Sequence, residues 1–219
     1  MTEVRLILGS PKIGRVIENA DSLLRQYRKD TGCYYLDYQP TTPQDAVVPE
    51  DLAVTLLVNS QAGWRAFRSL QLYATSIDLS ILPRKALEQT TPEERGIIRD
   101  TIVKMAQWPG FATSLATKVL HKKRPGLIPI LDNQAIFGAY LNEHWPEQVA
   151  QTKSIKDGAR ILQALDCIVF DLNRPENSSS WRKLQAMEPN RTLIQLFDSV
   201  WWMHFRLKQP VLRRLAKAG

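Results

Sequence analysis

Residues 107–134 read QWPGFATSLATKVLHKKRPGLIPILDNQ, and the order of features in this stretch decides the fold prediction. A Trp-Pro-Gly turn at 108–110 separates two stretches with helically spaced apolar residues, so it predicts two helices joined by a short hairpin. The second helix, expected over Thr113–Lys122, ends in a run of basic residues. A proline-bracketed aliphatic segment then leads to Asp132, which we expect to cap a third helix.

The hairpin has the physical properties of an anion site. Gly110 permits a tight backbone course, and the N–H groups that open the following helix can hold a phosphate. Ala112 precedes that helix, and Thr113 and Ser114 add hydroxyl donors at its start. Contacts of this kind fix the position of a nucleic-acid backbone without reading its sequence.

Basic residues continue along the same helix. Lys118 follows Ser114 by one turn on the same face, Lys122 follows by another turn, and Lys123 and Arg124 lie beside it. One interpretation is that these side chains contact phosphates. The alternative is a solvated helix end, because cations there interact favourably with the helix dipole, by about 0.3–1 kcal/mol each.

The stretch resembles the helix–hairpin–helix DNA glycosylases. In that superfamily a hairpin of the form Leu-Pro-Gly-hydrophobic-Gly is followed by a helix, and then by an aspartate that begins another helix. Pro109, Gly110 and Phe111 match the hairpin, and Asp132 in IPILDN matches the aspartate. In members that use a catalytic lysine, the lysine precedes the aspartate by the same interval that separates Ser114 from Asp132.

The chain also departs from that family pattern. Ala112 stands where the second hairpin glycine is expected, and it would be strained if that position required a positive φ. Ser114 stands at the lysine position, which is similar to the members that only cleave the base–sugar bond. A Schiff-base lyase step is then absent, unless Lys118 reaches in from the next turn. The iron–sulfur cysteines of some members are missing.

A second resemblance covers more of the chain. ATKVLHKKRPGLIPILD is similar to a group of uncharacterised bacterial proteins with Ala-Thr-Lys, Lys-Arg-Pro and Ile-Pro sequences, and the likeness extends to DYQP, DLAVTLL and LFDSVWWM. We place that group in the same broad fold group. It brings no established activity.

The rest of the pattern predicts a mainly α fold with a small N-terminal β element. We expect strands at Val4–Leu8 and Cys33–Tyr38, with a helix at Ile13–Lys29 between them. Capping boxes are expected at Thr91 and at Ser154–Asp157. Other helices are expected at Pro49–Asn59, Gly63–Ser76 and Arg191–Lys208, and NRPENSSS is expected to be a loop.

The resemblance implies a two-lobed, glycosylase-like helical fold within one globular unit of residues 1–219. Residues 44–125 would form the helical lobe that ends in the hairpin. Residues 1–43 together with 126–219 would form the other lobe, with DNA between the two.

Charge and composition bound the function. A net charge of +7 makes a polyanion a plausible partner. We expect no metal and no cofactor, since Cys33 and Cys167 are far apart and the three histidines are scattered. The start of the chain has no secretory pattern and no apolar run is long enough for a membrane span, so a reducing cytoplasm is expected.

The resemblance implies a DNA glycosylase that hydrolyses the N-glycosidic bond of a damaged or modified base. DNA repair by base excision, defence against foreign DNA and removal of modified bases all stay open as its role. A carboxylate at Asp132 would stabilise positive charge on the sugar and orient water, after the base is flipped from the duplex. The alternative is a non-catalytic helix–hairpin–helix module that binds DNA or another protein. In that case Asp132 only caps its helix, which is worth about 0.5–2 kcal/mol relative to alanine.

Overall fold

The computed structural model describes residues 3–31, 33–58, 62–152 and 157–218, and it is mainly helical as the sequence predicts. Its α-helices are α1 (Ala20–Thr31), α2 (Tyr34–Asp37), α3 (Val54–Leu57), α4 (Trp64–Tyr73), α5 (Pro92–Ala106), α6 (Thr113–Lys123), α7 (Leu141–His144), α8 (Pro146–Thr152), α9 (Asp157–Asn173), α10 (Ser178–Met187) and α11 (Leu193–Ala218). Short 3₁₀ helices are η1 (Pro49–Ala53), η2 (Ala74–Ser76), η3 (Leu79–Ile81), η4 (Leu87–Gln89) and η6 (Pro175–Asn177), and η5 (Asn133–Tyr140) is a π-helix.

The β element is a two-stranded antiparallel hairpin near the N-terminus. Strand β1 (Leu6–Leu8) pairs with β2 (Arg15–Ile17), and Leu6 lies opposite Ile17. Both of these side chains are buried, so the hairpin contributes one face to the core.

Two expectations for this region are wrong. The helix predicted over Ile13–Lys29 begins only at Ala20, because the preceding residues pair with β1 and Asn19 turns the chain at φ 55°. The strand predicted over Cys33–Tyr38 is instead the short helix α2. Its entry is set by Cys33 at φ 56°.

The predicted helix ends agree with the structure where their signals are local. The Thr91 hydroxyl accepts from the Glu94 N–H at 3.3 Å, and the Glu94 carboxylate accepts from the Thr91 N–H at 2.8 Å, so the predicted capping box is confirmed. The box expected at Ser154–Asp157 lies outside the described residues. The loop expected over NRPENSSS is wrong, because this segment contains the last residue of α9, the 3₁₀ helix η6 and the start of α10.

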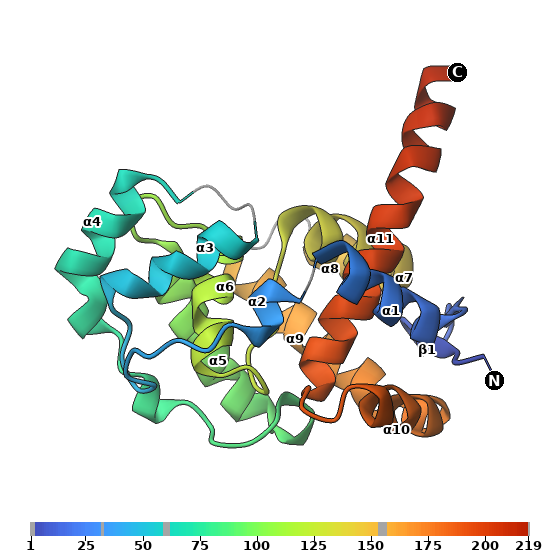
Figure 1. The fold of residues 1–219 in the computed structure, drawn as a ribbon, viewed down its shortest axis with the longest axis horizontal. Coiled ribbons are helices and arrows are strands. Elements are labelled where there is room, and N and C mark those ends of the chain that lie inside the picture. The colour runs from blue at the N-terminus through green and yellow to red at the C-terminus, as the bar shows by residue number, and fades with distance from the viewer. Residues whose placement is uncertain (1–2, 32, 59–61, 153–156, 219) are drawn as a thin grey trace.

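The helices are arranged around one hydrophobic core. Figure 1 shows α3, α4, α5 and α6 on one side of the molecule, and β1, α1, α10 and α11 on the other. Helix α5 packs against α6 and α9, and α11 packs against α1. The division into residues 44–125 and the remainder stays a prediction.

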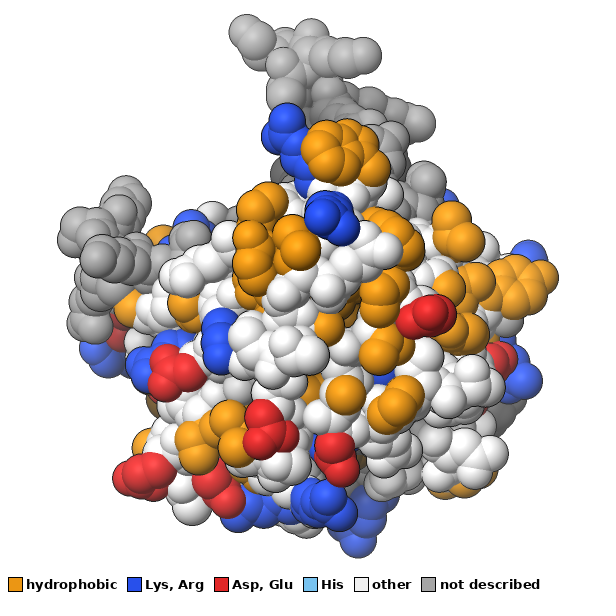
Figure 2. Space-filling model, turned by 90° about the vertical axis from the view of Figure 1, so that its left-hand side faces the viewer, with side chains coloured by type: hydrophobic (Ala, Val, Ile, Leu, Met, Phe, Trp, Pro, Cys, Tyr) orange, Lys and Arg blue, Asp and Glu red, His pale blue; other side chains and the backbone are white. Residues whose placement is uncertain are grey.

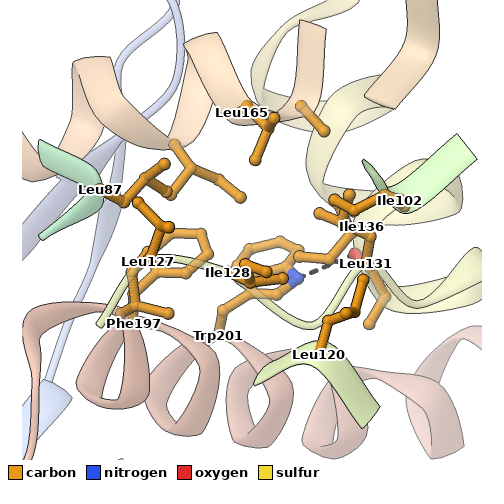
Figure 3. Packing of buried hydrophobic residues seen from close by; sticks show 14 of the residues in the cluster. Leu87, Ile102, Leu120, Leu127, Ile128, Leu131, Ile136, Leu165, Phe197 and Trp201 are labelled. Atoms are coloured by element: carbon orange, nitrogen blue, oxygen red, sulfur yellow. Dashed lines mark hydrogen bonds between the residues drawn. The ribbon is translucent and has the colours of Figure 1, made fainter. Parts of the chain in front are cut away.

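The core is centred on the segment that precedes Asp132. Figure 3 shows Leu127, Ile128 and Leu131 among buried side chains from α5, α6, η5, α9 and α11. The Trp201 indole N–H donates to the Ala135 carbonyl at 2.8 Å, which ties α11 to the start of η5. The aliphatic segment 125–131 is therefore interior structure rather than a surface loop.

Within the described residues, no helix combines the length and apolarity needed to cross a bilayer. Their His, Cys, Asp and Glu side chains form no group of three that could hold a metal ion.

Candidate functional site

Helices α5 and α6 are joined by the tight turn predicted from the sequence. The Phe111 N–H donates to the Trp108 carbonyl at 2.9 Å, and the two rings meet edge to face with their centroids 5.6 Å apart. Gly110 has φ +83°, a conformation that favours glycine. The two helices joined by a short hairpin that the sequence predicts here are thus present.

Ala112 carries no strain at the second glycine position. Its backbone is extended, with φ −147° and ψ 172°, which any residue adopts. It occupies the N-cap of α6, and no side chain caps that helix end. The first N–H groups of α6 have no acceptor within the helix, and the half-buried Thr113 and Ser114 lie beside them. This end of α6 can accept an anion.

The hairpin is held against α4 by close packing. A Cβ atom built on Gly110 would lie 2.5 Å from the Ala66 backbone nitrogen and 2.8 Å from the Arg65 Cβ. The Ser69 hydroxyl donates to the Pro109 carbonyl at 2.7 Å. The turn therefore has a fixed position relative to α4.

The basic end of α6 is placed differently from the exposed helix end that the sequence predicts. Lys122 is buried, and its ammonium group donates to the carbonyls of Tyr35, Leu36 and Tyr38 around α2. Burial lowers the pKa of Lys122 to about 8. These bonds fasten α2 to α6, so Lys122 is not available to a phosphate.

Lys123 and Arg124 fasten the neighbouring segment in the same way. The Lys123 ammonium lies 2.8 Å from Asp51 and donates to the Thr42 hydroxyl at 2.6 Å, with both charged side chains buried. The Arg124 guanidinium pairs with Asp45 and donates to the Gln44 carbonyl at 2.9 Å. Their donors bind partners inside the protein, so the expected phosphate contacts of Lys123 and Arg124 are wrong.

Asp132 caps η5, as the sequence predicts. Its Oδ1 atom accepts from the Gln134 N–H at 2.8 Å and from the Ala135 N–H at 2.9 Å. Both bonds end on the same oxygen, so the cap does not use Oδ2. Burial lowers the pKa of the Lys118 ammonium, and the nearby Asp132 carboxylate opposes this effect only in part. The Asp132 carboxylate therefore acts on the charge of Lys118, although Lys118 lies within α6 and Asp132 precedes η5.

A hollow of about 390 Å³ lies between the hairpin and the start of η5. The Arg160 guanidinium stands over the Phe137 ring, 5.1 Å from its centroid. Asp132 is not part of the wall, but the next residue, Asn133, is. The wall combines aromatic, polar and cationic groups: Ala106, Phe111, Ala112, Thr113, Asn133, Phe137 and Arg160.

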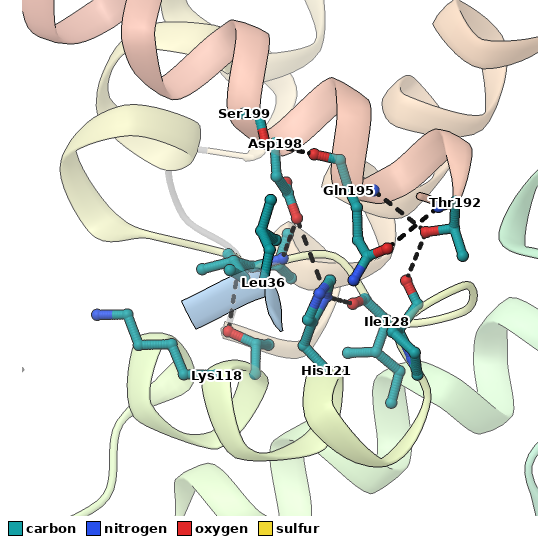
Figure 4. A network of polar contacts seen from close by, with 12 residues as sticks. Leu36, Lys118, His121, Ile128, Thr192, Gln195, Asp198 and Ser199 are labelled. Atoms are coloured by element: carbon teal, nitrogen blue, oxygen red, sulfur yellow. Dashed lines mark hydrogen bonds and ion pairs between the residues drawn. The ribbon is translucent and has the colours of Figure 1, made fainter. Parts of the chain in front are cut away.

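Side chains of α6 and α11 hold the segment that leads to Asp132 (Figure 4). Each bonds a backbone group of residues 125–131 that has no helix or sheet partner. From α6, the His121 Nδ1 lies 2.7 Å from the Ile128 carbonyl, and the Thr117 hydroxyl accepts from the Leu131 N–H at 3.1 Å. From α11, the Asp198 carboxyl accepts from the Ile130 N–H at 3.2 Å. Just before α11, the Thr192 hydroxyl donates to the Pro125 carbonyl at 2.9 Å. These bonds fix the position of Asp132 at the N-cap of η5.

His121 and Asp198 form a buried pair that the sequence analysis missed. Burial lowers the pKa of His121 to about 4 and raises the pKa of Asp198 to about 8. The Ile128 carbonyl can only accept, so the proton of neutral His121 is on Nδ1, which lies 4.0 Å from the Asp198 carboxyl. The available signal was a single acid within the apolar run LFDSVWW.

The predicted site residues thus fall into three groups. Gly110, Ala112, Thr113 and Ser114 lie together at the open end of α6. Lys118 interacts with Asp132. The basic residues at 122–124 form the internal attachment of the N-terminal segment to α6.

Residues 20–205 match a family of unknown function, DUF6308, and the chain belongs to this family. No curated protein and no solved structure matches the chain.

We predict that Gly110→Ala destabilises the fold. An alanine there is strained by its positive φ, at about 1–3 kcal/mol, and its Cβ meets the α4 backbone. Gly96→Ala is the matched control, because Gly96 lies within α5 and faces open space; it should be neutral or stabilising by up to about 1 kcal/mol. Urea unfolding measures both. Equal stability of Gly110→Ala and wild type would contradict the packing described.

We predict that the free energy of unfolding of Asp198→Asn falls less than that of the wild type as the pH rises toward 8. Asp198 keeps its proton in the folded state up to pH about 8, whereas an unfolded aspartate loses it near pH 4, so the wild-type free energy of unfolding falls as pH rises between these values. The lowered pKa of His121 acts in the opposite direction, but only below pH 6.5.

The comparison is therefore made between pH 6.5 and 8 by urea unfolding. Over this range the wild type should lose up to about 2 kcal/mol relative to Asp198→Asn, and contributions common to both proteins cancel. Parallel pH profiles for the two proteins would show that Asp198 is ionised in the folded state.

Proposed function

We propose that this member of the DUF6308 family binds DNA through the α5–α6 hairpin and hydrolyses the bond between a damaged or modified base and its deoxyribose. The observation that carries the proposal is the combination of an uncapped α6 N-terminus after the hairpin with the half-buried Asp132 that caps the next helix. The helix–hairpin–helix DNA glycosylases, which the sequence resembles, have a hairpin and an aspartate in the same order. This resemblance supports a catalytic role for Asp132.

The open end of α6 is the DNA-contact point in this proposal. The N–H groups around Thr113 and Ser114 point out of the helix end, and the helix dipole favours an anion there. A phosphodiester held in this way is anchored without regard to sequence. The net charge of +7 favours the approach of a polyanion.

Asp132 is the catalytic carboxylate in this proposal. Cleavage of the base–sugar bond develops positive charge on the deoxyribose, which a carboxylate at the anomeric carbon stabilises. The two capping bonds hold Asp132 in one orientation through Oδ1, and Oδ2 is then the oxygen available to the sugar or to the attacking water. A nucleobase is a better leaving group than an alcohol, so one carboxylate is sufficient.

The product would be an abasic site in an intact strand. A lyase step needs an amine that attacks the sugar, and Ser114 stands where the resemblance places that lysine. Lys118 is one turn further along α6 and interacts with Asp132, so its role in the proposal is electrostatic.

The hollow beside Asn133 is the place we assign to the extruded nucleotide. Its volume of about 390 Å³ falls within the range typical of small-molecule sites. Phe111 and Phe137 offer apolar surfaces, and Arg160 offers a cation above one of them. Such a wall suits a base with an attached phosphate.

One observation favours a second candidate, a DNA-binding module without catalysis. Asp132 is not in the wall of the hollow, and its Oδ1 is occupied by the cap. The hairpin would then hold DNA, and Asp132 would serve only to begin η5.

The hairpin contact predicts that Thr113→Glu weakens DNA binding. An acidic side chain in the first turn stabilises a helix but repels a phosphate at the same place. Gln185→Glu, on α10, makes the same change in charge at an exposed position away from the hairpin and is the control. Fluorescence anisotropy with a labelled duplex at low salt measures both. If the two variants bind equally well, the hairpin is not the contact.

The catalytic assignment predicts that Asp132→Asn lowers the rate of base release by about 10²–10⁴-fold. Asparagine caps helices nearly as well as aspartate, so folding and DNA affinity should be retained. The measurement uses duplexes that each carry one damaged or modified base, followed by alkali to reveal abasic sites. Wild-type protein that binds these duplexes and releases no base would establish the non-catalytic module instead.

A further inference from the structure

Helix α4 presents large apolar side chains to the solvent on the side opposite the core. Trp64 exposes 74% of its surface and Phe67 exposes 47%, whereas Ala66 and Leu70 are fully buried. Trp64 and Phe67 are three residues apart, so they lie next to each other on one helix face. Figure 2 shows hydrophobic side chains gathered on this side of the molecule, with most of the acidic side chains below them.

The charges on α4 are cationic only. Arg65 and Arg68 are exposed, and the stretch Trp64–Tyr73 contains no acidic residue. The Arg65 guanidinium lies over the Trp64 indole, 5.6 Å from the ring centroid. A surface that combines exposed aromatic rings with arginines complements a partner that has both π faces and negative charge.

The helix that carries this surface packs on the hairpin through its opposite, buried face, and the exposed Arg65 lies where the two faces meet. The Arg65–Ala66 backbone packs directly on Gly110, and the Ser69 hydroxyl donates to the Pro109 carbonyl. The Tyr73 and Trp108 rings add a contact with their centroids 6.0 Å apart. A strand whose phosphate is held at the hairpin would therefore lie close to α4.

We propose that α4 is a stacking surface for unpaired deoxynucleotides of the strand held at the hairpin. Trp64 and Phe67 stack on exposed bases, and Arg65 and Arg68 contact the phosphates between them. This inference rests on the proposed DNA binding by the hairpin. Base pairing and stacking in an intact duplex hide the base faces, so the surface selects single-stranded, gapped or bulged DNA over fully paired DNA.

The test measures the affinity of the full-length protein for a labelled oligothymidylate and for a fully paired duplex of equal length. Trp64→Leu keeps an apolar side chain and removes the ring. Since stacking is worth about 1–3 kcal/mol per base, the variant should bind the single strand about tenfold more weakly. Its affinity for the duplex should stay within about twofold of wild type, because the duplex does not use this surface. Phe67→Leu should act in the same direction.

The matched control is Trp202→Leu on α11. Trp202 is also exposed, and an arginine, Arg206, lies over its ring with the guanidinium 5.1 Å from the centroid. This control should leave both affinities unchanged. Urea unfolding checks that all three leucine variants keep the wild-type fold.

The outcomes separate the two proposals. Loss of single-strand binding alone in Trp64→Leu and Phe67→Leu supports the stacking surface. Unchanged affinities, or equal losses for both DNAs, overturn it while leaving the hairpin contact intact. A wild-type dimer that dissociates in Trp64→Leu, with unchanged DNA affinity, overturns it in favour of a second copy of the chain. Failure of the wild type to bind either DNA overturns the hairpin proposal and this one together.

Discussion

The structure depends on one constraint, the burial of a segment without regular structure. Residues 125–131 cross the core, where every backbone amide and carbonyl must find a partner. Side chains of α6 and α11 supply several of these partners, including His121 and Asp198. The segment is thereby fixed between two long helices, and Asp132, which follows it directly, has a fixed place at the start of η5.

Helix α6 connects the parts that the proposal needs. Its N-terminus is left open by Ala112, and its middle brings Lys118 near Asp132. Its C-terminus holds the N-terminal part of the chain through Lys122 and Lys123. Displacement of this helix would therefore move the anion-binding end, the Asp132 region and the attachment of α2 together. The packing of Gly110 on α4 joins the helix that carries the exposed aromatic surface to the hairpin.

Features with local signals could be predicted from the sequence. The hairpin at Gly110, the capping box at Thr91 and the cap at Asp132 each depend on residues a few positions apart, and all three are present. Features that depend on distant partners could not be predicted. Lys122 looks like part of an exposed basic helix end, but the carbonyls it binds lie more than 80 residues away in the chain. The role of Asp198 could not be predicted either, because its partner, the Ile130 N–H, lies in a distant part of the chain.

In the proposed function, Asp132 and the open end of α6 act on the same strand of DNA. A crystal structure of Asp132→Asn bound to a duplex with a stable abasic-site analogue tests this claim most directly. We expect a phosphate at the N–H groups of Thr113 and Ser114, and the abasic sugar beside position 132. DNA bound elsewhere on the protein, or a sugar remote from position 132, would contradict it.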